Sequence, residues 1–270
     1  MKRSARLWSS LGVWKPLEFI ITITVILGVD LNLNLNLASI SRPAWGRAES
    51  PERVSSIQQA SQPLKISTPC SPDHEHVHIA VHLSARDPKI KSPKVRGQRL
   101  DHDALWLSAQ LHEANALFAK LKICFWIEAS TPLPSRDGVM KTRAQRTKLG
   151  RTSGRLERGR IDLFIVNRLN DVDIAGAQIR GVHWRDPKDR KGKRWIILSR
   201  IARPKVMAHE LGHYFDLPHS TYPSSIMNKK SRKKPPMSAR GFVKKEYAIM
   251  KRAWDRMKRT GHLKPMPRPL

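Results

Sequence analysis

The sequence predicts an α+β domain in which a mixed, twisted β-sheet carries two main helices on one face, with a further helix at the C-terminus. Hydrophobic patterns follow the order strand, helix, strand, strand, two edge strands, helix, which is an α+β order. The 270 residues suffice for one large domain or two small ones, and 40% of them are hydrophobic, enough to fill a core. No segment of about 20 to 50 residues repeats, which excludes a solenoid.

The chain is strongly basic. Lys and Arg number 51 against 22 Asp and Glu, a formal net charge of +29. This charge predicts attraction to anionic surfaces or polymers and says nothing about the fold. The two cysteines are too few for a disulfide-dense scaffold or a Cys-only zinc finger. No uninterrupted apolar stretch reaches about 18 residues, which excludes a polytopic membrane protein.

Residues 1–48 have the layout of a signal peptide or an N-terminal membrane anchor. Basic residues, among them Lys2 and Arg3, precede an apolar run at 19–29 that is short for a membrane span. Ala48 ends a small-x-small site that a signal peptidase would cut. Cleavage would make the protein secreted, periplasmic or extracellular, whereas an uncleaved segment would anchor it to a membrane. Either outcome places the rest of the chain outside the cytoplasm.

Residues 49–73, rich in Ser, Pro and Gln, are predicted to be a linker or short pro-segment, and 74–270 the folded domain. Its first strand is predicted at 76–83, followed by a basic loop at 84–101. One face of that strand carries Val77, Ile79, Val81 and Leu83. The histidines at this strand are His74, His76, His78 and His82. They would be metal ligands or the solvated side of the strand, and strict alternation favours the solvated side.

A helix is predicted from Ala104 to about Leu121, with Asp103 as its N-cap. Its apolar residues recur at helical spacing: Leu107, Leu111, Ala114, Phe118 and Leu121. A second strand follows at 123–127. Residues 130–160 are rich in Gly, Arg and Lys without hydrophobic periodicity, and are predicted to form a long exposed excursion.

Three strands and two helices complete the predicted domain. The strands lie at 161–166, 181–184 and 195–198, the last two flanking a charged turn. A helix begins at Pro204, because proline is favoured at the first helical position. The last helix runs from about Ala239 to Arg259, with Ser238 as its cap. Its basic side is either the solvated face of a packed helix, the simpler interpretation, or a patch that binds nucleic acid or lipid.

The segment 209–219, HELGHYFDLPH, carries the chemistry. His209 and His213 lie four residues apart on the predicted helix, so both rings project from one face and can reach one metal ion. Glu210 follows the first histidine and can lean toward the open side of that metal. His219 would point elsewhere on a continuous helix, so the chain must break and fold back.

The sequence around residue 217 supplies that break. Pro218 disfavours helical geometry at Leu217. Asp216 belongs to the few residue types other than glycine that tolerate a left-handed conformation. The third histidine can therefore return toward the other two.

HExxH with a third histidine at this spacing resembles the metzincin clan of zinc endopeptidases. The segment 219–227, with Ser220, Pro223 and Met227, is similar to the matrixin branch in particular, and a weaker similarity extends over 76–227. The resemblance implies a metzincin-like fold with a zinc site at the end of the active-site helix.

The resemblance also implies a role for each residue of the motif. The zinc ligands would be His209, His213 and His219. They would bind one Zn²⁺ through neutral ring nitrogens and leave a fourth position for water. Glu210 would act as general base on that water and then protonate the departing amine. Met227 would form an apolar floor without being a ligand, and the peptide substrate would add as a strand to a sheet edge near 176–181.

The chain departs from the family pattern at three points. Asp216 replaces a glycine, and it is either tolerated in the turn or orients a ligand; turn geometry alone favours tolerance. Asn228 and Lys229 replace the Tyr-Pro that often follows the matrixin methionine, so the wall of the specificity pocket would differ. The structural-metal loop of matrixins is not recognisable, so no second zinc or calcium is expected.

Three further side chains each have two interpretations. Cys70 and Cys124 would form a disulfide in an oxidising compartment, or Cys70 would act as an inhibitory thiol like the cysteine of matrixin pro-segments. Tyr222 would approach the metal or have no catalytic part, and its position before Met227 favours the second.

These observations predict a secreted zinc-dependent endopeptidase acting on protein or peptide substrates. The alternative is a catalytically idle protein that docks on anionic polymers through its charge. The intact Glu210 and three histidines favour the enzyme. A nucleic-acid-binding protein is disfavoured by the secretory start and by the absence of a recognised nucleic-acid motif in the sequence.

Overall fold

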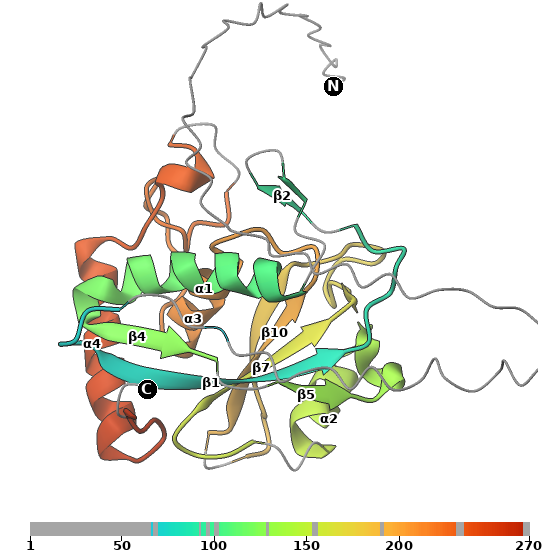
Figure 1. Cartoon of the computed structure of the whole chain (residues 1–270), viewed down its shortest axis with the longest axis horizontal. Helices are drawn as coiled ribbons and strands as arrows, with labels where there is room; N and C mark the ends of the chain where they lie inside the picture. Colours follow the sequence, from blue (N-terminus) through green and yellow to red (C-terminus); the bar gives the residue numbers. More distant parts are fainter. Residues whose placement is uncertain are drawn as a thin grey trace, which may run out of the picture. The chain divides into compact units, whose positions relative to one another are not determined.

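The computed structural model describes residues 66, 70–91, 93–95, 98–99, 103–127, 130–152, 156–189, 192–230 and 235–266 (Figure 1). The predicted signal peptide or anchor at 1–48 lies outside the described residues. So does the predicted linker at 49–73, apart from Ile66 and 70–73. Across the described ranges, no helix combines the length and the apolar character that crossing a bilayer requires.

A mixed sheet forms the centre of the fold, as predicted. Its strand order is β4 (Ile123–Trp126), β1 (Glu75–Ser84), β7 (Ile161–Val166), β10 (Arg194–Ser199) and β9 (Gly181–Arg185). All neighbours are parallel except β9, which runs antiparallel to β10 at the edge. β5 (Ser130–Leu133) pairs with β1 beyond β4, along the same side. The predicted strand positions are confirmed to within a residue or two.

Two short ribbons are also present in the described part of the chain. β2 (Lys94–Val95) pairs with β3 (Gln98–Arg99) inside the predicted basic loop. β6 (Val139–Met140) pairs with β8 (Arg168–Leu169), which follows directly on β7.

The prediction that one face of β1 is solvated is wrong. β1 lies inside the sheet, and His76 and His82 are buried together with the apolar residues of the opposite face. His82 Nε2 lies 3.0 Å from Asp162 Oδ1 on β7, and its Nδ1 lies 2.7 Å from Thr131 Oγ1 on β5. Alternation predicts a half-buried strand, but layers on both faces of the sheet bury both sets of side chains.

The first main helix is α1 (Asp103–Phe118), which ends in a 3₁₀ turn at Ala119–Leu121. Figure 1 shows it running across the sheet. Asp103, the predicted N-cap, is its first residue. The Asp103 carboxylate pairs with the buried Arg200 at 2.9 Å and with Arg86 at 2.6 Å. The ion pair with Arg200 therefore connects the start of α1 to the segment that follows β10.

The second main helix is α3 (Val206–Tyr214), which carries the HExxH motif. It begins after Lys205, whose left-handed backbone (φ 77°) delays the start beyond the predicted Pro204. Gln110 of α1 is buried and accepts the Met207 N–H at 3.0 Å. α1 and α3 bury Ile196 and Leu198 of β10 in one core, so both helices cover one face of the sheet, as predicted.

The predicted exposed excursion at 130–160 is wrong in part, because it contains β5, β6 and the helix α2 (Arg143–Thr152). Leu149 of α2 is buried in a second core with Trp195 and Ile197 of β10, which face away from α1 and α3. α2 therefore covers the other face of the sheet. Its sequence is so rich in Arg and Lys that apolar residues are too few to reveal a helical period.

The C-terminal helix is α4 (Lys244–Arg259), which starts later than predicted. Ser238, the predicted cap, lies in a separate 3₁₀ turn at Met237–Ala239. Instead, the Val243 N–H donates to Glu246 Oε2 at 2.9 Å. One side of the helix is buried, through Met250, Ala253, Trp254 and Met257.

Gly150→Ala should destabilise the protein, because a Cβ at this position would stand 2.6 Å from the buried Trp195 ring. We expect a loss of about 1–2 kcal/mol in the free energy of unfolding, after the better helix propensity of alanine is included. Urea unfolding followed by tryptophan fluorescence measures it. The exposed Lys141→Ala is the control and should change stability by less than about 0.5 kcal/mol. Equal stability of both variants would contradict the packing of α2 on β10.

Candidate metal centre

Three histidines converge at the C-terminal end of α3. One ring nitrogen from each of His209, His213 and His219 lies within 4.8 Å of the other two. The closest pair, His213 Nε2 and His219 Nε2, is 3.1 Å apart. Among the described residues, this is the one group of three or more His, Cys, Asp or Glu side chains that could hold a metal ion. The structure thus brings the three predicted ligands together.

Backbone carbonyls determine which nitrogen of each helical histidine faces the centre. His209 Nδ1 lies 2.7 Å from the carbonyl oxygen of Ile226, and His213 Nδ1 lies 2.6 Å from that of Leu217. A carbonyl can only accept a hydrogen bond, so each Nδ1 carries the proton. Each Nε2 therefore keeps its lone pair and can bind a metal.

The local environment also keeps the three imidazoles uncharged. Burial lowers the pKa of His209 to about 4, with a further contribution from His213. Burial likewise lowers the pKa of His213. For His219, partial desolvation and the neighbouring His213 lower the pKa to about 3. Neutral imidazoles are the form that binds Zn²⁺, so the three-histidine donor set fits this ion.

The break after α3 is a Schellman turn with aspartate in the left-handed position. Asp216 has φ 66°, as the sequence predicts. The Leu217 N–H donates to Gly212 at 2.9 Å and the Asp216 N–H to His213 at 3.0 Å, the two bonds that define this motif. The turn satisfies the last carbonyls of the helix and reverses the chain, which brings His219 back beside His213.

The Asp216 carboxylate binds three arginines. Its Oδ1 accepts from Arg185 of β9 at 2.6 Å and from Arg194 of β10 at 3.1 Å, while Oδ2 accepts from Arg256 of α4. Neither carboxylate oxygen is bonded to a histidine ring in the described structure. The residue therefore does more than tolerate the turn, because it joins the end of α3 to the sheet edge and to the C-terminal helix.

Glu210 lies against the edge strand β9. It is only 5% exposed, and its Oε2 accepts the His183 N–H at 2.7 Å. A Cβ at Gly181 would stand 2.9 Å from Glu210 Oε1, so this position has room for glycine only. Burial raises the pKa of Glu210 to about 8, although the His183 N–H opposes the shift. A carboxyl group in this environment can hold a proton near neutral pH.

The turn that contains Met227 packs directly beneath α3. A Cβ at Gly212 would stand 2.8 Å from Met227 Sδ, so glycine lets the buried methionine approach the helix between the two histidines. The neighbouring Ile226 supplies the carbonyl that orients His209. The predicted turn below the histidines therefore packs against α3 and orients the His209 ring.

α4 holds this turn in place, a role that the sequence did not predict. Glu246 Oε1 accepts the Ser225 hydroxyl at 2.7 Å, and Ser225 Oγ in turn accepts the Met227 N–H at 2.9 Å. All three residues are buried. The only sequence signal was the spacing of Glu246, three residues after the residue that caps α4, which is typical of a helix N-terminus.

β9 is one edge of the sheet, and no strand in the described part of the chain pairs with its outer side. The Arg180 carbonyl accepts the N–H of Ser199, the last residue of β10, whereas the His183 N–H points the other way, toward Glu210. Backbone direction alternates along a strand. The residues whose backbone groups face outward are Gly181, His183 and Arg185. This edge begins where the predicted one, at 176–181, ends.

An open groove of about 890 Å³ adjoins the histidines. It is lined by Arg143 and Thr147 on α2, by Trp184 on β9, and by His213 and Pro218 at the end of α3. The groove is therefore large enough to receive side chains of a peptide that lies along β9.

The structure also places the two cysteines and the tyrosine for which the sequence left two interpretations open. Cys70 and Cys124 form a disulfide, which ties the segment before β1 to β4 and leaves Cys70 without a free thiol. The alternative of an inhibitory Cys70 thiol is therefore not realised. Tyr222 is 39% exposed, and its carbonyl accepts the Asn228 side-chain amide at 3.0 Å, so Asn228 stabilises the turn before Met227.

Comparisons with known proteins find similarity among solved structures alone. No protein-family model and no curated protein matches the chain. Among solved structures, archaemetzincin from Methanopyrus kandleri is similar, with 16% sequence identity and a TM-score of 0.43 over 67% of this chain and 96% of that one. A likeness at this level decides neither family nor function, and the matrixin resemblance of the sequence stays a prediction.

Asp216→Asn should test the arginine cluster, because asparagine tolerates the left-handed turn but lacks the charge. Burial opposes ionisation of Asp216, yet Arg256 and Arg194 outweigh it and lower its pKa. The stabilisation is therefore fully present above the unfolded pKa of about 3.9 and is lost as pH falls through the native pKa. At pH 7 we expect the variant to lose about 1–3 kcal/mol in the free energy of unfolding.

Denaturant titrations of the wild type and Asp216→Asn at pH 7 and pH 3 measure this difference. The exposed Asp255→Asn, which breaks a surface pair with Lys251, should change stability by less than about 0.5 kcal/mol. A loss of the same size at both pH values would contradict a charge-based role for Asp216.

Proposed function

We propose that this protein is a zinc-dependent endopeptidase. The observation that carries the proposal is the convergence of three neutral histidines whose helical members have their Nδ1 protons directed to backbone carbonyls. Three such donors leave one position of a tetrahedral site open, the arrangement of catalytic rather than structural zinc. Within the metzincins, the matrixin branch is the proposed relation, supported by Ser220, Pro223 and Met227.

Zinc, when bound, would supply the Lewis acidity that activates a water molecule and polarises the scissile carbonyl. Glu210 would take the proton of that water and deliver it to the departing amine. The His183 N–H fixes the position of its carboxyl group, and burial raises the pKa of that group, hence its affinity for a proton. Met227 would keep the floor of the site dry and rigid.

The proposed substrate is a protein or peptide in extended conformation. The outward backbone groups of β9 would pair with it as an added strand. Glu210 lies at that same edge, so the carbonyl to be attacked would lie close to the base. Side chains on one side of the peptide would enter the groove that Trp184, Thr147 and His213 line.

We propose further that the enzyme acts outside the cytoplasm. The Cys70–Cys124 disulfide is typical of oxidising compartments. The signal-like pattern at 1–48 supports the same location, with a membrane-anchored form as the alternative. The basic charge would then hold the enzyme near anionic polymers without being part of catalysis.

One zinc ion per chain should be found by elemental analysis of the purified protein after dialysis. His213→Ala should lose it, because two imidazoles leave zinc under-coordinated. His112→Ala, a histidine of α1 away from the centre, should retain full occupancy. Absence of stoichiometric zinc from the wild type, even after zinc is supplied, would overturn the proposal.

Glu210→Gln should keep the fold and the zinc but lose activity by at least about 100-fold, since the amide can still accept the His183 N–H but cannot act as a base. Casein cleavage with and without a chelator, together with zinc analysis, measures this. Glu113→Gln on α1 is the matched control and should cleave at the wild-type rate. Turnover by Glu210→Gln near that rate would show that another group is the base.

A further inference from the structure

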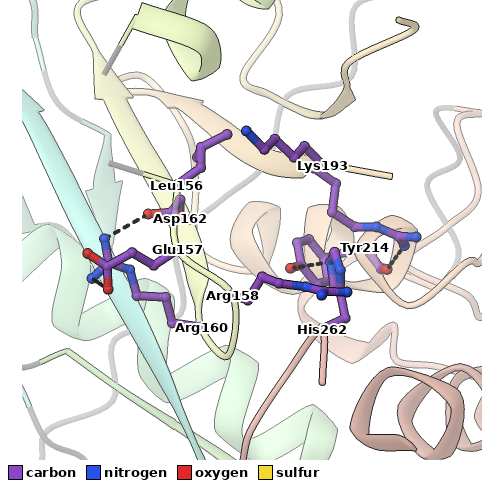
Figure 2. Close-up of a pocket in the computed structure, with 9 residues that line it drawn as sticks. Leu156, Glu157, Arg158, Arg160, Asp162, Lys193, Tyr214 and His262 are labelled. Atoms are coloured by element: carbon purple, nitrogen blue, oxygen red, sulfur yellow. Dashed lines mark hydrogen bonds and ion pairs between the residues drawn. The ribbon is translucent and has the colours of Figure 1, made fainter. Parts of the chain in front are cut away.

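A small basic pocket borders the end of α3 and takes no part in the proposed reaction (Figure 2). Its volume is about 60 Å³, room for a few water molecules. Four segments meet there: the turn 156–160 before β7, the start of β10, the last residue of α3 and the C-terminal turn. The residues that matter for its chemistry are Arg158, Arg160, Lys193, Arg194, Tyr214 and His262.

Positive charge exceeds negative charge around this pocket. Four permanent cations line it, against two carboxylates. Both carboxylates are engaged by one arginine, because Arg160 lies 2.9 Å from Glu157 and 3.4 Å from Asp162. Asp162 is also held by His82 at 3.0 Å, and burial raises its pKa, which weakens its negative charge further. Arg158 and Lys193 therefore have no carboxylate partner among the residues that line the pocket, while Arg194 pairs with Asp216 outside it.

Arg194 provides a donor without an acceptor. Its Nη1 donates to the Tyr214 carbonyl at 2.8 Å and to Asp216 at 3.1 Å. Its Nε is buried and has no hydrogen-bond partner among the described residues. A buried guanidinium N–H without an acceptor is costly. Figure 2 shows Lys193 and Arg158 extending from different sides of the same pocket.

The walls of the pocket are fixed by bonds between distant parts of the chain. The Gly159 N–H donates to the His262 carbonyl at 3.0 Å, and the Lys264 N–H donates to the Gly159 carbonyl at 3.0 Å. Tyr214 Oη lies 3.3 Å from His262 Nε2. Arg158 therefore extends from a turn whose backbone is bonded at Gly159 to the C-terminal turn.

We propose that this pocket binds one tetrahedral inorganic oxyanion, such as sulfate or phosphate. Charge-assisted hydrogen bonds from Arg158, Lys193 and Arg194 would recognise it. The small volume suits a free ion better than a phosphate group carried on a larger molecule. Since Arg194 also holds the Tyr214 carbonyl and Asp216, the bound anion would stabilise the end of the active-site helix.

Calorimetric titration of the full-length protein with sodium sulfate tests the proposal, with ionic strength held constant by sodium gluconate. The wild type should bind one sulfate per chain. Arg158→Gln combined with Lys193→Gln should weaken binding by about 10-fold or more. Lys188→Gln combined with Arg252→Gln removes the same charge from exposed positions outside the pocket, and should bind within about twofold of the wild type.

Two further titrations distinguish this pocket from the histidine centre and from a site for organic phosphates. His219→Ala, which lacks a predicted metal ligand, should bind sulfate as the wild type does; loss of binding would locate the anion at the histidines and overturn the proposal. O-phosphoserine should bind more weakly than sulfate, and equal or tighter binding would contradict a free-ion site. Absence of saturable binding to the wild type, or the same loss in both double variants, would also overturn it.

Melting curves give an independent readout. Sulfate should raise the melting temperature of the wild type and of the charge-matched control, because a ligand that binds only the folded state stabilises it. The Arg158→Gln and Lys193→Gln double variant should melt like the wild type without sulfate and gain less when sulfate is added. Equal gains in all three proteins would indicate a general salt effect and contradict the pocket.

Discussion

The left-handed turn at Asp216 is the constraint on which the metal centre depends. α3 presents two histidines on one face, and the third can join them only if the helix ends at once and the chain reverses. The same residue then uses its carboxylate to bind Arg185, Arg194 and Arg256. One backbone angle and one side chain thus join α3, two strands at the sheet edge and the C-terminal helix. A glycine would satisfy the angle more easily but would leave the three arginines to repel one another.

The C-terminal helix supports the centre at both of its ends. Near its start, Glu246 holds Ser225 and through it the turn that contains Met227. Near its end, Arg256 binds the carboxylate at the end of α3. Between them, Trp254 donates to Glu75 of β1 at 2.6 Å, and Lys258 lies 2.6 Å from the same carboxylate. Part of the basic character of this segment is therefore used inside the domain, where it ties the helix to the sheet.

Small residues allow α3 to approach the edge of the sheet and the turn below it. Gly181 leaves room for Glu210, and Gly212 leaves room for Met227. Larger side chains at either position would push the helix away from the strand or from the turn below it. Glu210 is consequently held against β9, an edge strand of the sheet, and His209 and His213 lie on the helix above a packed, apolar turn. Rigid support of this kind is what a metal site needs to keep an open position.

Local sequence determined the motif and most of the strands. Neighbouring residues alone specify these features, because helix period and turn chemistry act over a few positions. They are the spacing of His209, Glu210 and His213, the break at Asp216 and Pro218, and the apolar runs of β4 and β7. Only the tertiary structure determined which elements and side chains lie next to one another. It buried His76 and His82 on a strand that alternates like a surface strand, because the sheet is covered on both faces. It made a helix of the arginine-rich residues 143–152 by packing Leu149 and Gly150 against Trp195. It also paired Asp216 with arginines from three distant elements, a contact that no local pattern predicts. Long-range ion pairs depend on which distant segments the fold brings together, and not on the residues beside them in sequence.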